Sequence, residues 1–140
     1  AQIMDRVIPK ATALGICPDC VVTPDVTGVG RPSPFMLYEC MHQLNVYPPC
    51  RVIKVGDTVV DMQEGKNAGA YAIGVLTGSN LLGLTQAEYE AMGSRELEER
   101  KKKAALRYLN SGADLVIDSI AELPQVVQML NHRMAKGEAL

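Results

Sequence analysis

The segment VIKVGDTVVDMQEG, at residues 52–65, contains two aspartates four positions apart at the point where an apolar run ends. Asp57 and Asp61 would lie at the end of a strand and one helical turn further on, so their carboxylates can converge on one hard cation such as Mg2+. A purely local role is also open. Asp57 or Thr58 can cap the following helix, and Thr58 and Asp61 have the spacing of a capping box.

A single arginine in the loop GVGRPSP raises a complementary question of charge. Arg31 comes just before a helix expected to start near Pro34, so its guanidinium faces the partial positive charge of a helix N-terminus. That placement is unfavourable unless an anion lies between them. The alternative is an arginine that extends into water. Acids for a cation and an arginine for an oxyanion are the groups that phosphoryl-transfer chemistry uses.

Short apolar runs that alternate with helical patterns predict an α/β fold with a Rossmann-like parallel sheet flanked by helices. The runs are apolar throughout, as expected for strands that are covered on both faces. Ligands of such sheets bind beyond the carboxyl ends of the strands, where Asp57 lies. The predicted strands cover residues 20–23, 52–55, 71–76 and 113–117.

Capping residues and apolar periodicity predict the helices between these strands. The charged run EERKKK, at 98–103, is expected to be a solvated face of one of them. The opening residues 1–14 read as a helix with no cap before it, so we expect the chain to begin in the middle of a fold. The other expected boundaries are Ser33 and Asn45, the GDT segment and Gly69, a capping box at Thr85, Ser94 and Gly112, a capping box at Ser119, and Pro124.

The bulk composition limits the classes of function. With 140 residues, 47% of them apolar, the chain is long enough for one domain with a core. A net charge of -2 gives no basic face for a nucleic acid. No apolar stretch is long enough to span a membrane, and residues 1–16 lack the apolar core of a signal peptide. We therefore expect a cytoplasmic protein with neither a nucleic-acid nor a membrane partner.

The four cysteines do not form a convincing metal motif. Cys17 and Cys20 have CxxC spacing, but a zinc site needs four ligands, and Cys40, His42 and Cys50 have no matching spacing. We expect structural or incidental thiols, because free cysteine commonly behaves as a small apolar residue.

Three segments resemble the C-terminal half of the phosphonoacetaldehyde hydrolase (phosphonatase) family of the haloacid dehalogenase superfamily. They are GRPSP, VIKVGDTVVDMQEGKNAGAYAIGV and TGSNLLGLT. The GDxxxD pattern alone is typical of the whole superfamily. The YPP before the strand, the GSNxLGLT loop and VIDSIAELP are narrower, and the similarity covers essentially all of the chain.

The resemblance implies Mg2+-dependent cleavage of the carbon-phosphorus bond of phosphonoacetaldehyde to acetaldehyde and phosphate. It implies that Asp57 binds Mg2+ directly and that Asp61 supports the metal, directly or through water. It assigns Arg31 a catalytic and substrate-binding role, neutralising the nucleophile and the phosphoryl oxygens. A small-molecule phosphonate is then the substrate. The resemblance also implies a homodimer formed largely through a cap domain.

Several parts of the family pattern are missing from these residues. No DxDxT or DxAGT segment supplies the nucleophilic aspartate, and no lysine occupies the place of the cap lysine that forms a Schiff base with the aldehyde. We therefore expect residues 1–140 to be the C-terminal part of one core domain, without the N-terminal strand and the cap, and to be inactive alone. Two alternatives stay open: a phosphomonoester phosphatase or mutase of the same superfamily, and a non-catalytic fragment.

Overall fold

A computed structural model describes residues 3–138 and contains a parallel three-stranded sheet in the order β1-β2-β3. The strands are β1 (Ile53–Gly56), β2 (Tyr71–Val75) and β3 (Leu115–Ile117). Ile53 lies opposite Tyr71 in the first pair, and Ile73 lies opposite Leu115 in the second. All three strands were predicted, so the α/β class with a parallel sheet and flanking helices is confirmed.

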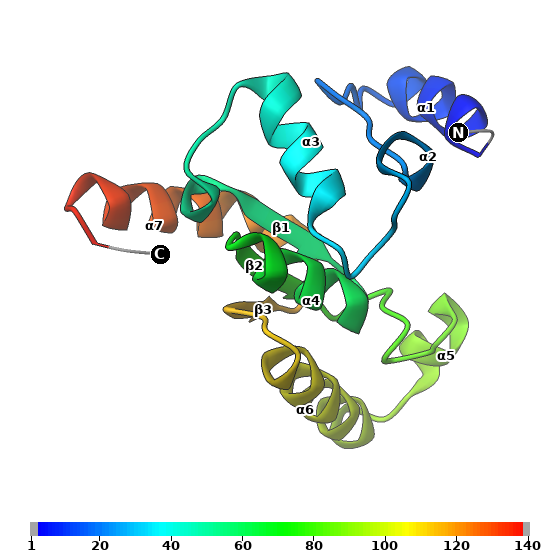
Figure 1. Cartoon of the computed structure of the whole chain (residues 1–140). Helices are drawn as coiled ribbons and strands as arrows, with labels where there is room; N and C mark the ends of the chain where they lie inside the picture. The colour runs from blue at the N-terminus through cyan, green and yellow to red at the C-terminus, as the bar shows by residue number, and fades with distance from the viewer. Residues whose placement is uncertain (1–2, 139–140) are drawn as a thin grey trace.

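Helices pack on both faces of this sheet (Figure 1). Met62, Ala72 and Tyr108 share one apolar cluster, which places α4 and α6 on one face. Ile73 and Leu130 belong to a second cluster, which places α7 on the other. The helices are α1 (Met4–Ala13), α2 (Pro24–Thr27), α3 (Phe35–Leu44), α4 (Val59–Ala68), α5 (Gln86–Ala91), α6 (Ser94–Asn110) and α7 (Leu123–Ala135), with short 3-10 turns at Pro49–Arg51 and Ile120–Glu122.

The fourth predicted strand, at residues 20–23, is wrong. This segment is irregular, and Thr23 instead precedes α2 in an extended conformation. A strand is stabilised by hydrogen bonds to a neighbour, and no strand in the described residues lies beside it. The prediction that every strand is covered on both faces also fails for β1. All four residues of β1 are only half-buried, because β1 is an edge strand in the described part of the chain.

The predicted capping residues are largely confirmed. Thr58, Thr85 and Ser119 each form a capping box, so the backbone donors at these three starts have side-chain partners. Asn45 and Gly69 end their helices in the left-handed conformation, with φ of 53° and 74°. One boundary differs, because α3 begins at Phe35 and no side chain caps it.

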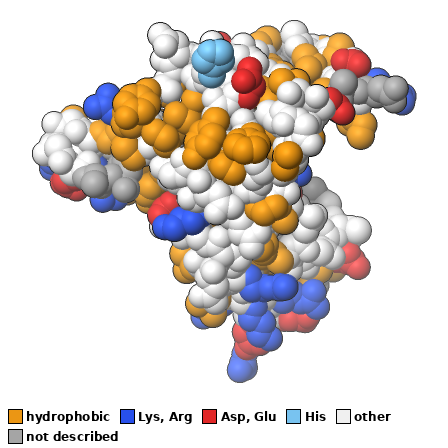
Figure 2. Space-filling view, in the orientation of Figure 1, with side chains coloured by type: hydrophobic (Ala, Val, Ile, Leu, Met, Phe, Trp, Pro, Cys, Tyr) orange, Lys and Arg blue, Asp and Glu red, His pale blue; other side chains and the backbone are white. Residues whose placement is uncertain are grey.

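The charged run on α6 is a solvated face, as predicted. Figure 2 shows acidic and basic side chains gathered at the end of the molecule that α6 occupies in Figure 1. Only Lys101 in this run is turned inward, where its Nζ lies 2.8 Å from Asp118 Oδ1. None of the helices in residues 3–138 has the length and apolar character needed to cross a membrane.

Candidate active site

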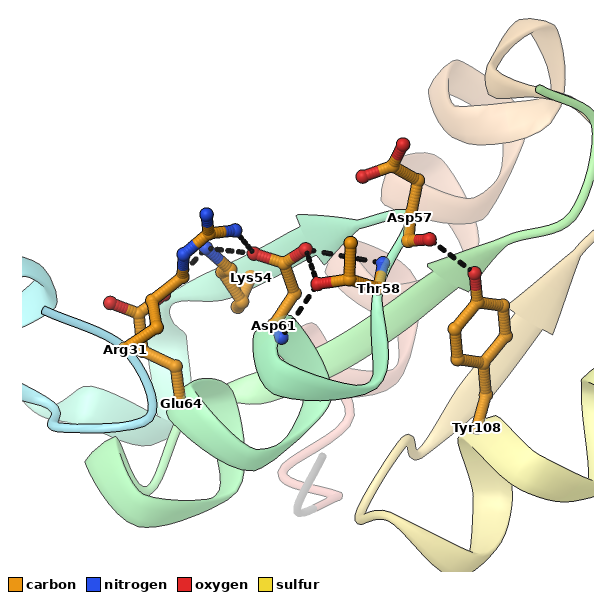
Figure 3. Close-up of polar contacts among 7 residues, drawn as sticks. All are labelled: Arg31, Lys54, Asp57, Thr58, Asp61, Glu64 and Tyr108. Carbon is orange, nitrogen blue, oxygen red and sulfur yellow. Dashed lines mark hydrogen bonds and ion pairs between the residues drawn. The ribbon is translucent and has the colours of Figure 1, made fainter. Parts of the chain in front are cut away.

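The candidate site lies at the carboxyl end of β1, where the chain turns into α4 (Figure 3). Asp57 is the first residue after the strand and is exposed. Its backbone carbonyl accepts a 2.6 Å hydrogen bond from the hydroxyl of Tyr108, a fully buried residue of α6. Its carboxylate points away from the neighbouring ion pairs and has no hydrogen bond or ion pair with the described residues.

The cap of α4 is formed by Thr58 and Asp61, not by Asp57. Asp61 Oδ2 accepts hydrogen bonds from the Thr58 hydroxyl at 2.6 Å and from the Thr58 backbone N–H at 3.2 Å. The Thr58 hydroxyl in turn accepts from the Asp61 N–H at 3.2 Å. The local role that the sequence left open for Asp57 is therefore filled by its neighbours.

Asp61 also holds two cations through its other oxygen. Its Oδ1 lies 2.7 Å from Arg31 Nη1 and 3.0 Å from Lys54 Nζ. The Asp61 side chain is 5% exposed, whereas that of Arg31 is 45% exposed. Burial raises the pKa of Asp61, but hydrogen bonds from Thr58, Arg31 and Lys54 outweigh burial and hold this pKa at about 2. The Asp61 carboxylate, in turn, raises the pKa of the Arg31 guanidinium.

A second acid of α4 reaches the same lysine. Glu64 is 1% exposed, and its Oε2 lies 2.6 Å from Lys54 Nζ. The contact is an ion pair without hydrogen-bond geometry, so neither Glu64 oxygen has a hydrogen-bond partner among the described residues. Arg31, Asp61, Lys54 and Glu64 thus form a chain of alternating charges, which we call the charge chain.

The loop that carries Arg31 is fixed to α4 at a second point. Asn67 Nδ2 donates a 2.8 Å hydrogen bond to the carbonyl of Pro32, the residue after Arg31. Arg31, Lys54 and Glu64 also line an open cavity of about 950 Å³ that extends toward α1, α2 and α3. The arginine is therefore held beside open space that a ligand could enter.

Comparisons with known proteins identify the family. Residues 28–123, more than half of the chain, match the HAD-hydrolase-like family. This chain belongs to the haloacid dehalogenase-like hydrolases. It is 47% identical over 129 residues to the phosphonoacetaldehyde hydrolase of Bacillus cytotoxicus, which covers 92% of this chain and 49% of that protein. The phosphonoacetaldehyde hydrolase of Bacteroides fragilis is 42% identical over 133 residues, covering 95% of this chain and 51% of that protein.

The solved structures agree with this haloacid dehalogenase-like assignment. A phosphonoacetaldehyde hydrolase-like protein from Oleispira antarctica superposes with a TM-score of 0.90 at 34% identity, over 98% of this chain and 50% of that one. The chain thus spans about half the length of the relatives it matches, and it corresponds to their C-terminal half.

Within this haloacid dehalogenase-like core, the structure brings two of the three predicted site residues together. Arg31 and Asp61 are in direct contact, while the Asp57 carboxylate points elsewhere. The described residues contain no cluster of three or more acids, histidines or cysteines able to hold a metal. That Asp57 and Asp61 bind a metal therefore stays a prediction.

Three further residues of the site were missed by the sequence reasoning. Lys54 was regarded only as part of the strand, and Glu64 and Asn67 were given no role. A lysine inside an otherwise apolar strand was the available signal, because a buried ammonium requires an acidic partner. The i, i+3 spacing of Asp61 and Glu64 placed two such partners on one face of α4.

Proposed function

We propose that this chain supplies the metal- and phosphoryl-binding part of a phosphonoacetaldehyde hydrolase active site in the protein that carries it. The observation that carries this proposal is the division of roles at the start of α4. Thr58 and Asp61 form the cap, which leaves the exposed Asp57 carboxylate at the strand end with no local structural task. The names of the relatives support the choice of substrate.

The residues fit Mg2+ through Asp57. Mg2+ keeps several waters and is commonly held by one or two carboxylates together with substrate phosphate oxygens, so a site within this chain needs no larger cluster. Both Asp61 oxygens already have partners in hydrogen bonds or ion pairs, so Asp61 would support such a site through water. When bound, Mg2+ would neutralise charge on the phosphoryl oxygens.

Arg31 is proposed to bind the phosphoryl group. Its Nη1 is held by Asp61, and its half-exposed guanidinium keeps further donors for oxygens that enter from solvent. The planar fork of arginine suits two such oxygens at once. The attacking carboxylate and the amine of the family's reaction are not assigned to residues of this chain.

The metal role of Asp57 is tested by Asp57→Asn in the protein that carries this chain. We expect hydrolysis of phosphonoacetaldehyde to fall on the order of 100-fold or more, with a higher Mg2+ concentration needed for half-maximal rate. Asp118→Asn is the matched control, because Asp118 directly follows β3 at the same edge of the sheet. Equal and near-normal rates for the two variants would remove Asp57 from the site.

The arginine is tested by Arg31→Lys. This variant keeps the charge and loses the fork, so we expect a partial defect in phosphate release. An unchanged KM and rate would show that Arg31 does not contact the substrate.

The substrate class is tested by borohydride reduction in the presence of phosphonoacetaldehyde. A hydrolase that forms a Schiff base is trapped as a covalent adduct, which mass spectrometry detects. A phosphomonoester phosphatase of the same superfamily gives no adduct, and this outcome would select the alternative function.

A further inference from the structure

Lys54 occupies an unusual place for a lysine. It lies within β1, its side chain is 17% exposed, and α4 packs on its stem. The contact is so close that a Cβ at Gly65 would be 3.1 Å from Lys54 Cβ and 3.2 Å from its Cγ. The first part of the side chain is therefore held by packing against α4.

This ammonium group connects two acids that lie on one face of α4. Lys54 Nζ is 3.0 Å from Asp61 Oδ1 and 2.6 Å from Glu64 Oε2. Neutralising Glu64 does not require a contact with Asp61, yet Lys54 also contacts Asp61 Oδ1, the same oxygen that binds Arg31. The shared oxygen makes Lys54 a neighbour of Arg31 through a single atom.

The exposed arginine depends on this oxygen. Arg31 comes from a loop, and within the described residues its only hydrogen bond is to Asp61 Oδ1, at 2.7 Å. The direction of the guanidinium therefore follows the direction of the Asp61 carboxylate. Thr58 fixes Oδ2 of that carboxylate, and Lys54 fixes Oδ1.

We propose that Lys54 is a positioning residue that holds Asp61 Oδ1, and through it Arg31, for binding of a phosphoryl anion. Glu64 is the counter-charge that lets a lysine occupy this buried place. The charge chain then contains two cations and two acids. Lys54 neutralises part of the negative charge of Asp61. The positive charge of Arg31 is therefore less completely neutralised by Asp61, and the guanidinium still attracts an incoming anion. This proposal rests on the proposed function, because it assigns Arg31 to the phosphoryl group.

A double variant separates positioning from simple stabilisation. Lys54→Met alone leaves Glu64 charged and buried, which is strongly destabilising. Lys54→Met combined with Glu64→Gln removes both charges together, and we expect its urea unfolding midpoint to stay close to that of the unaltered protein. Lys102→Met is the matched control, because Lys102 is an exposed lysine of α6.

Two measurements on the double variant test the proposal. Inorganic phosphate in the presence of Mg2+ is the binding probe, and we expect its Kd to rise roughly tenfold, with no change in Lys102→Met. The guanidinium signals of Arg31, followed by 15N NMR, should change in the double variant, because Asp61 Oδ1 is no longer held by Lys54 and its 2.7 Å contact with Arg31 Nη1 loosens. A folded double variant that binds phosphate as tightly as the unaltered protein would overturn the positioning role.

The two proposals fail in different ways. If Arg31→Ala leaves phosphate affinity unchanged, the proposed function is wrong at Arg31, and the Arg31 guanidinium signals of the double variant still report whether Lys54 holds the Asp61 carboxylate. If Arg31→Ala weakens phosphate binding and the double variant does not, the proposed function stands and the role of Lys54 is refuted.

Discussion

Gly56→Ala is the substitution for which the structure predicts the sharpest local conflict. A Cβ at Gly56 would lie 2.3 Å from Asp61 Cβ and 2.5 Å from Asp61 Cγ. The backbone of Gly56 is not left-handed, so the cost is steric. Overpacking a tight site costs about 1–3 kcal/mol, and moving Asp61 off its cap adds about 1 kcal/mol. We expect the free energy of unfolding to fall by roughly 2–4 kcal/mol.

Equilibrium unfolding in urea measures this loss. With a slope of about 2 kcal/mol per molar urea, the midpoint should fall by roughly 1–2 M. Gly30→Ala is the matched control, because a Cβ there meets its nearest atom, Pro24 Cγ, at an ordinary 3.4 Å. A Gly56→Ala midpoint equal to that of Gly30→Ala would refute the close approach of α4 to β1.

Three further predictions concern titration, a buried hydroxyl and thiol reactivity. The pKa of Asp61 is about 2 in the folded protein, against an ordinary value of 3.8. The ionised Asp61 carboxylate therefore contributes fully to the stability of the fold above pH 3.8, and this contribution is lost as the pH falls toward 2. Unfolding measured across this range should show a loss of roughly 2 kcal/mol that is missing in Asp61→Asn. Tyr108→Phe leaves the Asp57 carbonyl without its 2.6 Å donor and should cost about 1 kcal/mol in urea unfolding, whereas an unchanged midpoint would discount this bond. Burial and the neighbouring Cys20 raise the pKa of Cys40 to about 11, so iodoacetamide at neutral pH should label the exposed Cys17 and Cys50 before Cys40. Labelling of Cys40 ahead of these two thiols would contradict its burial.

The helix boundaries could be predicted from sequence where a particular type of side chain bonds to the free backbone N–H groups at a helix start. Thr58, Thr85 and Ser119 were found because a hydroxyl and an acid three residues later satisfy two donors at a helix start. Residues 20–23 misled the prediction because β-branched and apolar residues suit a strand only when a neighbour supplies the hydrogen bonds. Pairing is a property of the whole sheet, and a local pattern does not report it.

The site was only partly predictable for a related reason. The spacing of Asp57 and Asp61 was visible, but spacing could not tell which acid caps α4 and which remains exposed. Backbone geometry decides this, because Gly56 allows Asp61 to lie directly against the end of β1. The contact between Arg31 and Asp61 spans 30 positions in sequence, and no local pattern encodes it.

The charges at the end of β1 give a physical reason for the cation that the proposed function places there. The charge chain is balanced, because Arg31 and Lys54 offset Asp61 and Glu64 at distances of 2.6 to 3.0 Å. Asp57 adds a negative charge that no described residue neutralises, so the group as a whole would repel a phosphoryl anion. Under the proposed function, a divalent ion bound at Asp57 would reverse that sign, and Arg31 and the metal would then attract the same anion. The proposed function therefore assigns the exposed Asp57 carboxylate the task of holding the cation that phosphate binding by the whole group would require.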